Sequence, residues 1–334
     1  MGDIDDQIKE LEDQIANTKY NKKTQHAIGL YKAKLAKLKD KKESKVSKKS
    51  GKSDHGWSVR RSGDATVVLV GFPSVGKSSL LNCITNAESE VGHYAFTTLT
   101  CIPGELEYKG AKIQILDVPG IVKGAAAGTG RGKEVLQVIR NADLIIILLD
   151  VFYPDHLSVI EKEIFDTHVR INQKKPDVKI KKTIRGGIRV GSTKKLSHLD
   201  EETVKGILKE FRISNADVLI RTDINADQFI DVVEGNRVYV PSIKVVNKID
   251  MVDDKHLQDF SKKVKPDLMI SANTGKNIEL LKDLIFEKLE LMPIYCKEVG
   301  KKANLEEHLV LRKGSTVEEK CRKLQKDNIE KYSS

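Results

Sequence analysis

A chain of 334 residues with 39% hydrophobic residues is long and apolar enough for two or three domains with packed cores. No apolar stretch approaches the length of about 18 residues that a membrane-spanning helix needs, which excludes a membrane-spanning protein. The formal net charge of +10 favours an anionic partner, most simply nucleic acid, although solubility alone explains part of it.

Cysteine usage and the N-terminal segment both indicate an intracellular protein. The four cysteines show no C-x-x-C pair and no histidine at metal-ligand spacing. They are Cys83, Cys101, Cys296 and Cys321. We expect reduced thiols that mostly pack in the interior. The N-terminal residues lack the apolar core of a secretory signal, so the expected location is the cytoplasm.

Two helices are expected at the N-terminus. Apolar residues recur there with steps of three and four along two stretches, which a polar break at residues 17–24 separates. They are Ile4, Ile8, Leu11 and Ile15, then Ile28, Tyr31, Leu35 and Leu38. Residues 1–40 are therefore predicted to form an antiparallel helical hairpin. Residues 39–52 are almost purely Lys, Ser, Glu and Gly, so we expect residues 41–63 to form either a flexible basic linker or an arm on RNA.

Regular alternation of strands and helices begins near residue 64. Apolar strands are predicted at residues 65–70, 106–109, 112–116, 144–149, 243–246 and 268–270. Helices are expected after Gly76, Lys133 and Lys276. This pattern indicates an α/β fold with a parallel sheet that helices cover on both faces. Its two parts are predicted at residues 64–173 and 238–292.

The segment after the first strand reads G-F-P-S-V-G-K-S, from Gly71 to Ser78. The spacing G-x-x-x-x-G-K-S between a strand and a helix is that of the phosphate-binding loop of nucleoside triphosphatases. Glycines let backbone N–H groups converge on phosphate oxygens, at a helix N-terminus that favours anions. We expect Lys77 to reach the β- and γ-phosphates and Ser78 to bind Mg²⁺. The predicted nucleotide-binding residues are Gly71, Pro73, Ser74, Val75, Gly76, Lys77, Ser78 and Ser79.

Two further segments are expected near the γ-phosphate. Asp117 ends a buried strand and begins D-V-P-G, so its carboxylate can hold Mg²⁺ through water, while the Gly120 N–H can point at the phosphate. Thr98, or alternatively Thr97, is expected to supply the second protein ligand of Mg²⁺. The predicted metal ligands are therefore Ser78, Thr98 and Asp117. The predicted catalytic residues are Lys77, Thr98 and Gly120.

A glycine-rich segment follows at residues 121–132, and we expect a mobile loop that the γ-phosphate orders. Many GTPases have glutamine directly after the glycine of D-x-x-G, where it orients the attacking water. Ile121 stands here, so either the backbone and water, a partner or a monovalent cation must position the nucleophile. Arg131 is either a charge stabiliser supplied in cis or a solvated loop residue.

The chain between the fourth and fifth predicted strands is too long for one crossover helix, which residues 155–172 can supply. Residues 174–237 contain β-like runs at 178–184, 187–190 and 218–221 and an amphipathic helix around 200–211, and are predicted to form an inserted α+β lobe. Its first part is rich in cations, and we expect either a surface that faces nucleic acid or a solvated face. These cations are Lys174, Lys175, Lys179, Lys181, Lys182, Arg185, Arg189, Lys194 and Lys195.

The sequence N-K-I-D from Asn247 to Asp250 ends a later strand. A carboxylate at Asp250 can accept hydrogen bonds from N1–H and the 2-amino group of guanine, a pattern that adenine lacks. The predicted base-binding residues are Asn247, Lys248 and Asp250. Ser271, Ala272 and Asn273 end the next strand, where a backbone N–H can reach guanine O6. A nucleotide site built from these segments predicts bound GTP or GDP with Mg²⁺.

Several motifs resemble one family closely. The runs at residues 71–79, 94–104 (Y-A-F-T-T-L-T-C-I-P-G) and 117–125 (D-V-P-G-I-V-K-G-A) are similar to the Obg-related GTPases. The segments T-C-I-P-G at residues 100–104 and G-N-R-V-Y-V-P at residues 235–241 resemble the developmentally regulated GTP-binding (DRG) proteins. The resemblance covers essentially the whole chain.

The resemblance implies a helical hairpin, a GTPase domain, an inserted lobe similar to a domain of a small-subunit ribosomal protein, and a ubiquitin-like TGS domain. It implies slow GTP hydrolysis with Mg²⁺, association with translating ribosomes and a dedicated stabilising partner protein, for a chain that we expect to be monomeric. Potassium stimulates members of the wider group. The potassium-dependent enzymes usually carry asparagine where this chain has Ser74, which leaves a K⁺ site open.

Residues 293–334 resemble only the first part of a TGS domain. Strands are expected at residues 294–297 and 308–312, followed by a helix with capping-box spacing from Thr316 to Glu319. The resemblance implies further strands beyond Ser334, and such a half domain is not expected to form a stable sheet alone.

The sequence therefore predicts a cytoplasmic GTPase switch that acts on the ribosome. One alternative is an RNA- or ribosome-binding scaffold that holds nucleotide structurally without turnover. A second alternative is an ATPase with the same phosphate-binding loop.

Overall fold

The structure is a computed structural model that describes residues 2–19, 21, 24–49, 63–85, 102–118, 138–295, 308–318 and 321–322. The chain divides into two compact units. Unit 1 comprises residues 1–55 and 173–239, and unit 2 comprises residues 56–172 and 240–334. Within the described residues, no helix is long and apolar enough to cross a membrane.

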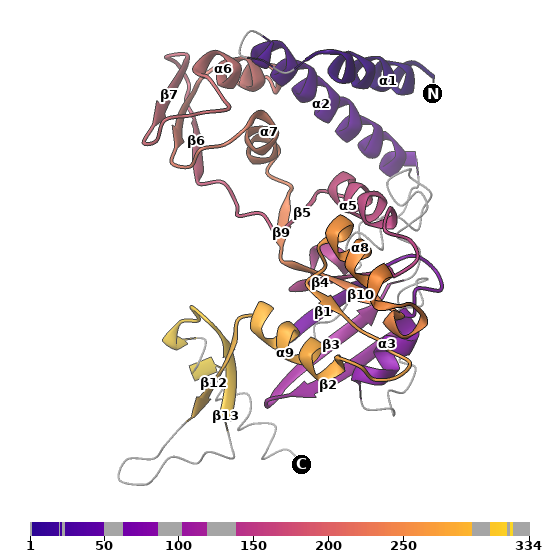
Figure 1. The fold of residues 1–334 in the computed structure, drawn as a ribbon. Helices are drawn as coiled ribbons and strands as arrows, with labels where there is room; N and C mark the ends of the chain where they lie inside the picture. The colour runs from indigo at the N-terminus through magenta and orange to yellow at the C-terminus, as the bar shows by residue number, and fades with distance from the viewer. Residues whose placement is uncertain are drawn as a thin grey trace. The chain divides into compact units, whose positions relative to one another are not determined.

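Unit 2 is built on a six-stranded sheet in the order β11-β10-β4-β1-β3-β2, and Figure 1 labels all of these strands except β11. The strands are β1 (Ala65–Val70), β2 (Ile102–Tyr108), β3 (Ala111–Asp117), β4 (Leu144–Asp150), β10 (Ser242–Asn247) and β11 (Leu268–Met269). The predicted α/β fold is confirmed, with one difference: β2 pairs antiparallel with β3. Only Lys109 and Gly110 join them, both with positive φ, and a two-residue turn of this kind can connect only antiparallel strands.

Alternate residues of these strands bury one face against α3 (Lys77–Ile84) and α9 (Ile278–Lys288). Leu80 and Leu81 of α3 and Leu281 and Ile285 of α9 are buried in this core. The remaining helical segments are α5 (His156–Asp166), which contacts β4, the short η1 (Ile249–Met251) and α8 (Asp254–Val264). The helix expected after Lys133 falls largely outside the described residues, of which 138–140 are helical.

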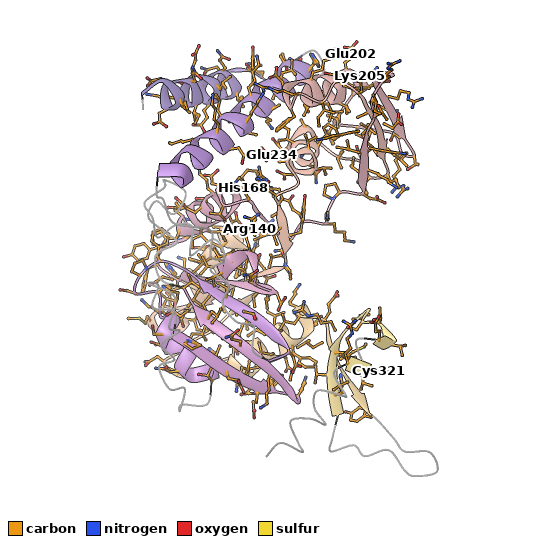
Figure 2. All side chains as sticks on the ribbon, turned by 180° about the vertical axis from the view of Figure 1, so that it is seen from behind. Arg140, His168, Glu202, Lys205, Glu234 and Cys321 are labelled. Carbon is orange, nitrogen blue, oxygen red and sulfur yellow. The ribbon has the colours of Figure 1, made fainter. Side chains whose placement is uncertain are left out.

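The crossover helix predicted over residues 155–172 is too long. The helix α5 ends at Asp166, and His168, which Figure 2 labels, has a φ of 66°. A non-glycine residue in this left-handed region does not continue a right-handed helix. Residues beyond it form β5 (Val169–Ile171), which pairs in a two-stranded sheet with β9 (Val238–Val240).

The C-terminal strands β12 (Leu291–Tyr295) and β13 (His308–Arg312) pair antiparallel. The first strand begins three residues before its predicted start at residue 294, because Leu291 is paired with Arg312. The two strands do not stand alone. Leu291 and Val310 are buried in the same core as α3 and α9, so unit 2 supplies the apolar contacts that an isolated two-stranded sheet lacks.

Unit 1 joins an N-terminal helical hairpin to the segment inserted between β5 and β9. Its elements are α1 (Gly2–Asn17), α2 (Gln25–Lys49), β6 (Val178–Lys182), β7 (Ile188–Ser192), α6 (Glu201–Glu210), β8 (Ala216–Ile220) and α7 (Ala226–Glu234). The three strands form a sheet in the order β6-β8-β7. The helix α2 packs on α6 and α7. A Cβ on Gly29 would lie 2.6 Å from Thr203 Cγ2, and one on Gly206 would lie 2.8 Å from Leu30 Cδ2, so glycines let these helices approach closely.

The basic linker predicted from residue 41 is wrong over its first part, because α2 continues to Lys49. Two ion pairs tie this helix to α1, Lys42 with Asp5 at 2.6 Å and Lys39 with Glu12 at 3.0 Å. Lysine and glutamate are also good helix formers. Composition alone indicated a flexible segment, whereas the structure continues the helix through its first part. Residues 50–62 lie outside the described part of the chain.

Candidate nucleotide-binding site

The phosphate-binding loop predicted from the sequence connects β1 to α3. Gly76 directly precedes α3 with a φ of 94°, a conformation that disfavours any residue with a Cβ. A Cβ at this position would also lie 2.4 Å from Asn247 Nδ2. Glycine is therefore required for two reasons: its backbone conformation disfavours a Cβ, and Asn247 of β10 approaches too closely to leave room for one. Ser74, in the same loop, has a φ of 63°.

Lys77 begins α3 and folds back over the loop. Its ammonium group donates to the carbonyl oxygens of Gly71 at 3.1 Å and Phe72 at 3.0 Å. Burial lowers the pKa of Lys77, and attraction to Asp117 partly opposes that shift. A partly desolvated cation held by neutral carbonyls lies where a phosphate group would be a stronger partner.

Ser78 and Asp117 form the second part of the site. The Ser78 hydroxyl donates to Asp117 Oδ2 at 3.2 Å, and Asp117 is 7% exposed. Burial raises the pKa of this carboxyl group, while Lys77 and the Ser78 hydrogen bond act in the opposite direction. Asp117 Oδ1 is buried and has no hydrogen-bond partner among the described residues. Because Mg²⁺ prefers hard oxygen ligands, a hydroxyl beside an unsatisfied carboxylate oxygen fits this ion.

Asn247 joins three segments that are far apart in the sequence. Its amide nitrogen donates to the carbonyl oxygen of Val75 at 2.9 Å, and its Oδ1 accepts from the N–H of Ala272 at 2.9 Å. The residue is 3% exposed. The N-K-I-D segment, the phosphate-binding loop and the segment after β11 therefore meet at the carboxyl ends of the parallel strands, where open α/β sheets bind ligands.

Lys248 and Asp250 follow Asn247 in the turn after β10. The Lys248 ammonium donates to the carbonyl oxygen of Ser74 at 2.8 Å and to Asp150 Oδ2 at 2.7 Å. Asp250 lies on η1, is exposed, and makes no hydrogen bond or ion pair with any described residue. Its carboxylate is thus available to a ligand, whereas the Lys248 side chain ties this turn to the phosphate-binding loop.

The segment after β11 forms a tight turn. Ser271 is fully buried, and its hydroxyl accepts from the N–H of Thr274 at 3.1 Å. Its own N–H donates to the carbonyl oxygen of Lys276. Ala272 is fixed by Asn247, as described above. These bonds engage the N–H groups of Ser271 and Ala272 within the protein, and the contact between this turn and guanine O6 stays a prediction.

Two features of the site were not predicted from the sequence. One is Asp150, the last residue of β4, which pairs with Lys248; a single acidic residue at the end of an apolar run was its only sequence signal. The other is a ring stack in which Phe72 of the phosphate-binding loop lies 3.7 Å from His156 of α5, centroid to centroid. The predicted residues Thr97, Thr98, Gly120, Ile121 and Arg131 lie outside the described residues and stay predictions.

Comparison with known proteins identifies two family profiles in this chain. A profile described as "50S ribosome-binding GTPase" matches residues 66–182. A second, described as the C-terminal region of the same type of domain, matches residues 185–291.

Close relatives extend over nearly the whole chain. An uncharacterized GTP-binding protein of Methanocaldococcus jannaschii is 53% identical over 98% of this chain and 84% of its own length. The developmentally-regulated G-protein 3 of Arabidopsis thaliana is 44% identical over 99% of this chain and 90% of its own length. Among solved structures, Era from Aquifex aeolicus bound to GDP and AlF4⁻ has a TM-score of 0.36 at 20% identity, covering 68% of this chain and 57% of that one.

Proposed function

We propose, since this chain belongs to the family of developmentally regulated GTP-binding proteins, that it is a molecular switch that binds GTP with Mg²⁺ and hydrolyses it slowly. The observation that carries this proposal is the pair of bonds that join Asn247 to Val75 and Lys248 to Ser74. They bring the segment that can read a purine base next to the loop that can bind its phosphates.

The base specificity follows from Asp250. Its carboxylate is exposed and without a partner among the described residues, and a carboxylate accepts hydrogen bonds but donates none. Guanine offers two donors on one edge, N1–H and the 2-amino group, whereas adenine offers an acceptor at N1. A site built on these bonds can reject the wrong base by about 10⁴-fold or more, because the carboxylate would be left unpaired.

The phosphates would be bound by the loop N–H groups and by Lys77. In the structure the ammonium group is held by two carbonyl oxygens, which it would exchange for phosphate oxygens when a nucleotide binds. Ser78 and Asp117 would hold Mg²⁺, which neutralises charge on the phosphates when it is bound. The remaining predicted ligands, Thr98 and Gly120, complete this proposal as the groups next to the γ-phosphate.

Hydrolysis is expected to be slow. Ile121 cannot orient an attacking water, so catalysis rests on positioning and on charge neutralisation by Lys77. We expect the purified protein to release phosphate from GTP at about 10⁻⁴ to 10⁻² s⁻¹, as unassisted GTPases do. Phosphate release measured with Mg²⁺ and with excess EDTA, in potassium and in sodium, tests this. A rate above about 1 s⁻¹ without partners would refute the slow switch. Tight GTP binding with no release of phosphate would favour the alternative function, a scaffold that holds nucleotide structurally without turnover.

We further propose that unit 1 binds RNA, as a ribosome-associated switch requires. Nine lysines and arginines stand against one acidic residue, Asp177, between residues 174 and 195. We call these nine residues the cationic face. They are Lys174, Lys175, Lys179, Lys181, Lys182, Arg185, Arg189, Lys194 and Lys195. All nine are exposed, and within the described chain only Arg189 has an acidic partner, Asp217.

The sheet of unit 1 explains why these cations are available. Val178 and Ile180 of β6 pack against the core of the unit. Because neighbouring strand residues point to opposite faces, Lys179 and Lys181 project from the other face of the sheet. Exposed lysines are well hydrated in the free protein. Their binding to a polyanion is favourable because it releases the counterions bound to the polyanion. The profile described as "50S ribosome-binding GTPase" also supports ribosomal RNA as this polyanion.

Replacing Lys179, Lys181 and Lys182 with glutamine tests the cationic face. We expect weaker binding to purified ribosomal RNA, and a slope of log K against log salt that falls by about 2 to 3. The matched control replaces Lys255, Lys262 and Lys263 of α8, which are also exposed, and should change neither quantity. Equal losses in the two variants would mean that net charge, rather than this face, binds RNA.

A further inference from the structure

We propose that Asp150 is a positioning residue for the nucleotide site, which holds the Lys248 ammonium against the phosphate-binding loop. This inference rests on the proposed function of the same site. The geometry that points to it is a chain of two contacts: Asp150 Oδ2 accepts from Lys248 Nζ at 2.7 Å, and the same ammonium donates to the carbonyl oxygen of Ser74 at 2.8 Å.

The carboxylate of Asp150 is fixed by its surroundings. The residue ends β4 and lies directly opposite Asn247 of β10 in the register of the sheet. Its side chain is 10% exposed. Oδ1 accepts from the N–H of Phe152 at 3.0 Å, and its backbone carbonyl accepts from the N–H of Tyr153 at 3.0 Å. With one oxygen engaged by this turn, the other faces Lys248.

Lys248 depends on this partner. Its φ of 68° is unfavourable for a residue with a Cβ, so the surrounding structure must hold it. Its side chain is 29% exposed, and a lysine with access to water normally samples many rotamers. Among the described residues, Asp150 supplies its one carboxylate and Ser74 its one carbonyl contact. Without the charge of Asp150, a single neutral acceptor would remain to keep the ammonium over the loop.

The consequence concerns nucleotide affinity. Lys248 lies between Asn247, which is bonded to Val75, and the turn that carries Asp250. Fixing its side chain before the ligand arrives lowers the ordering cost that binding would otherwise include. Asp150 thus pre-organises the guanine-binding turn and the phosphate-binding loop as one arrangement, without touching the nucleotide itself.

A purely local role for Asp150 is the alternative: it would only stabilise the turn at Phe152. The Asp150→Asn substitution separates the two roles. Asparagine keeps an oxygen that accepts from the Phe152 N–H, but it replaces the charged oxygen at Lys248 with an NH₂ donor. The turn should therefore persist while the contact with the ammonium is lost.

The test is the dissociation rate of a fluorescent GDP analogue from the full-length protein with Mg²⁺. We expect Asp150→Asn to raise this rate about tenfold, the usual effect of losing a hydrogen bond to a charged group. The Asp143→Asn variant is the matched control, because Asp143 directly precedes the other end of β4, accepts from the Thr66 N–H and, like Asp150, pairs with a cation, Arg312. It should leave the rate within about twofold of the wild type. Thermal unfolding of both variants reports any loss of fold.

A double-mutant cycle distinguishes a role of Asp150 through Lys248 from a purely structural role, because only the first makes the effects of the two substitutions non-additive. If Asp150 acts through Lys248, Asp150→Asn should have little further effect in a Lys248→Met background. The two substitutions should also lower the affinities for GDP and IDP by the same factor, because neither removes the Asp250 carboxylate that accepts from the 2-amino group. Additive effects in the cycle, or an unchanged dissociation rate in Asp150→Asn, would overturn the role of Asp150 and leave the proposed function of the site intact. A wild type that does not bind GDP would overturn the proposed function as well.

Discussion

Replacing Asp250 with asparagine is expected to exchange the base preference of this protein from guanine to xanthine. The carboxylate accepts from two guanine donors, whereas an asparagine side chain presents one acceptor and one donor group. Xanthine carries an oxygen where guanine has its 2-amino group, and that oxygen can accept from the new amide. We expect the affinity for GDP to fall by about 10³- to 10⁴-fold and XDP to become the tighter ligand.

Competition between GDP and XDP for a fluorescent nucleotide measures this exchange. The Asp254→Asn variant is a suitable control, because Asp254 is an exposed aspartate close in sequence on α8 and has no predicted contact with the base. It should retain the preference for GDP. If Asp250→Asn binds GDP as tightly as the wild type, the base assignment is wrong, and an ATPase or a site with another base-reading group becomes the better interpretation.

The substitution Lys77→Met is expected to slow GTP hydrolysis strongly without unfolding unit 2. Methionine keeps much of the length and apolar character of the lysine stem but removes the charge. Burial already lowers the pKa of Lys77, so the folded, ligand-free protein gains little from this charge and its thermal stability should change little. The charge matters when phosphates are present, and its loss should reduce the single-turnover rate by about 10²- to 10³-fold.

Single-turnover phosphate release at saturating GTP checks this prediction, with thermal unfolding of the same preparation as the measure of folding. Lys288→Met serves as the control, because Lys288 is an exposed lysine at the end of α9 and forms no hydrogen bond or ion pair with a described residue. It should hydrolyse GTP like the wild type. Phosphate release at the wild-type rate in Lys77→Met would point to a contaminating enzyme or to a different phosphate site.

The local parts of the site could be predicted from the sequence because they depend on residues close together in the chain. A buried strand, a loop with fixed glycines and a helix are contiguous from Ala65 to Ile84, and the structure has them at those positions. The meeting of Asn247 with the loop could also be predicted, since parallel strands place their carboxyl ends at one edge. Thr98 and Gly120 remain predictions.

Contacts between distant segments could not be predicted in the same way. Asp150 meets Lys248 because the register of β4 and β10 places Asp150 opposite Asn247. That register cannot be predicted from a single sequence. The two ion pairs between α2 and α1 likewise join residues that lie on different helices and far apart in the sequence. Composition alone therefore favoured a linker where the structure has a helix.

The inserted segment shows both cases. The helix α7 was missed, although Asn225 and Gln228 form a capping box and Gly235 ends the helix with a φ of 66°. Those are local signals that could have found it. By contrast, the packing of the hairpin against the insert depends on Gly29 and Gly206, which are far apart in sequence and meet different partners. Close helix packing of this kind has no local signature.

Displacement of a fluorescent GDP analogue from the wild-type protein shows whether segments distant in sequence bind one guanine nucleotide. With Mg²⁺ present, unlabelled GDP and GTP should displace the analogue at similar concentrations, while ADP and ATP should fail even at about 10³-fold higher concentration. Displacement by ATP as effective as that by GTP, or an analogue that does not bind at all, would mean that these segments do not form a guanine-nucleotide site.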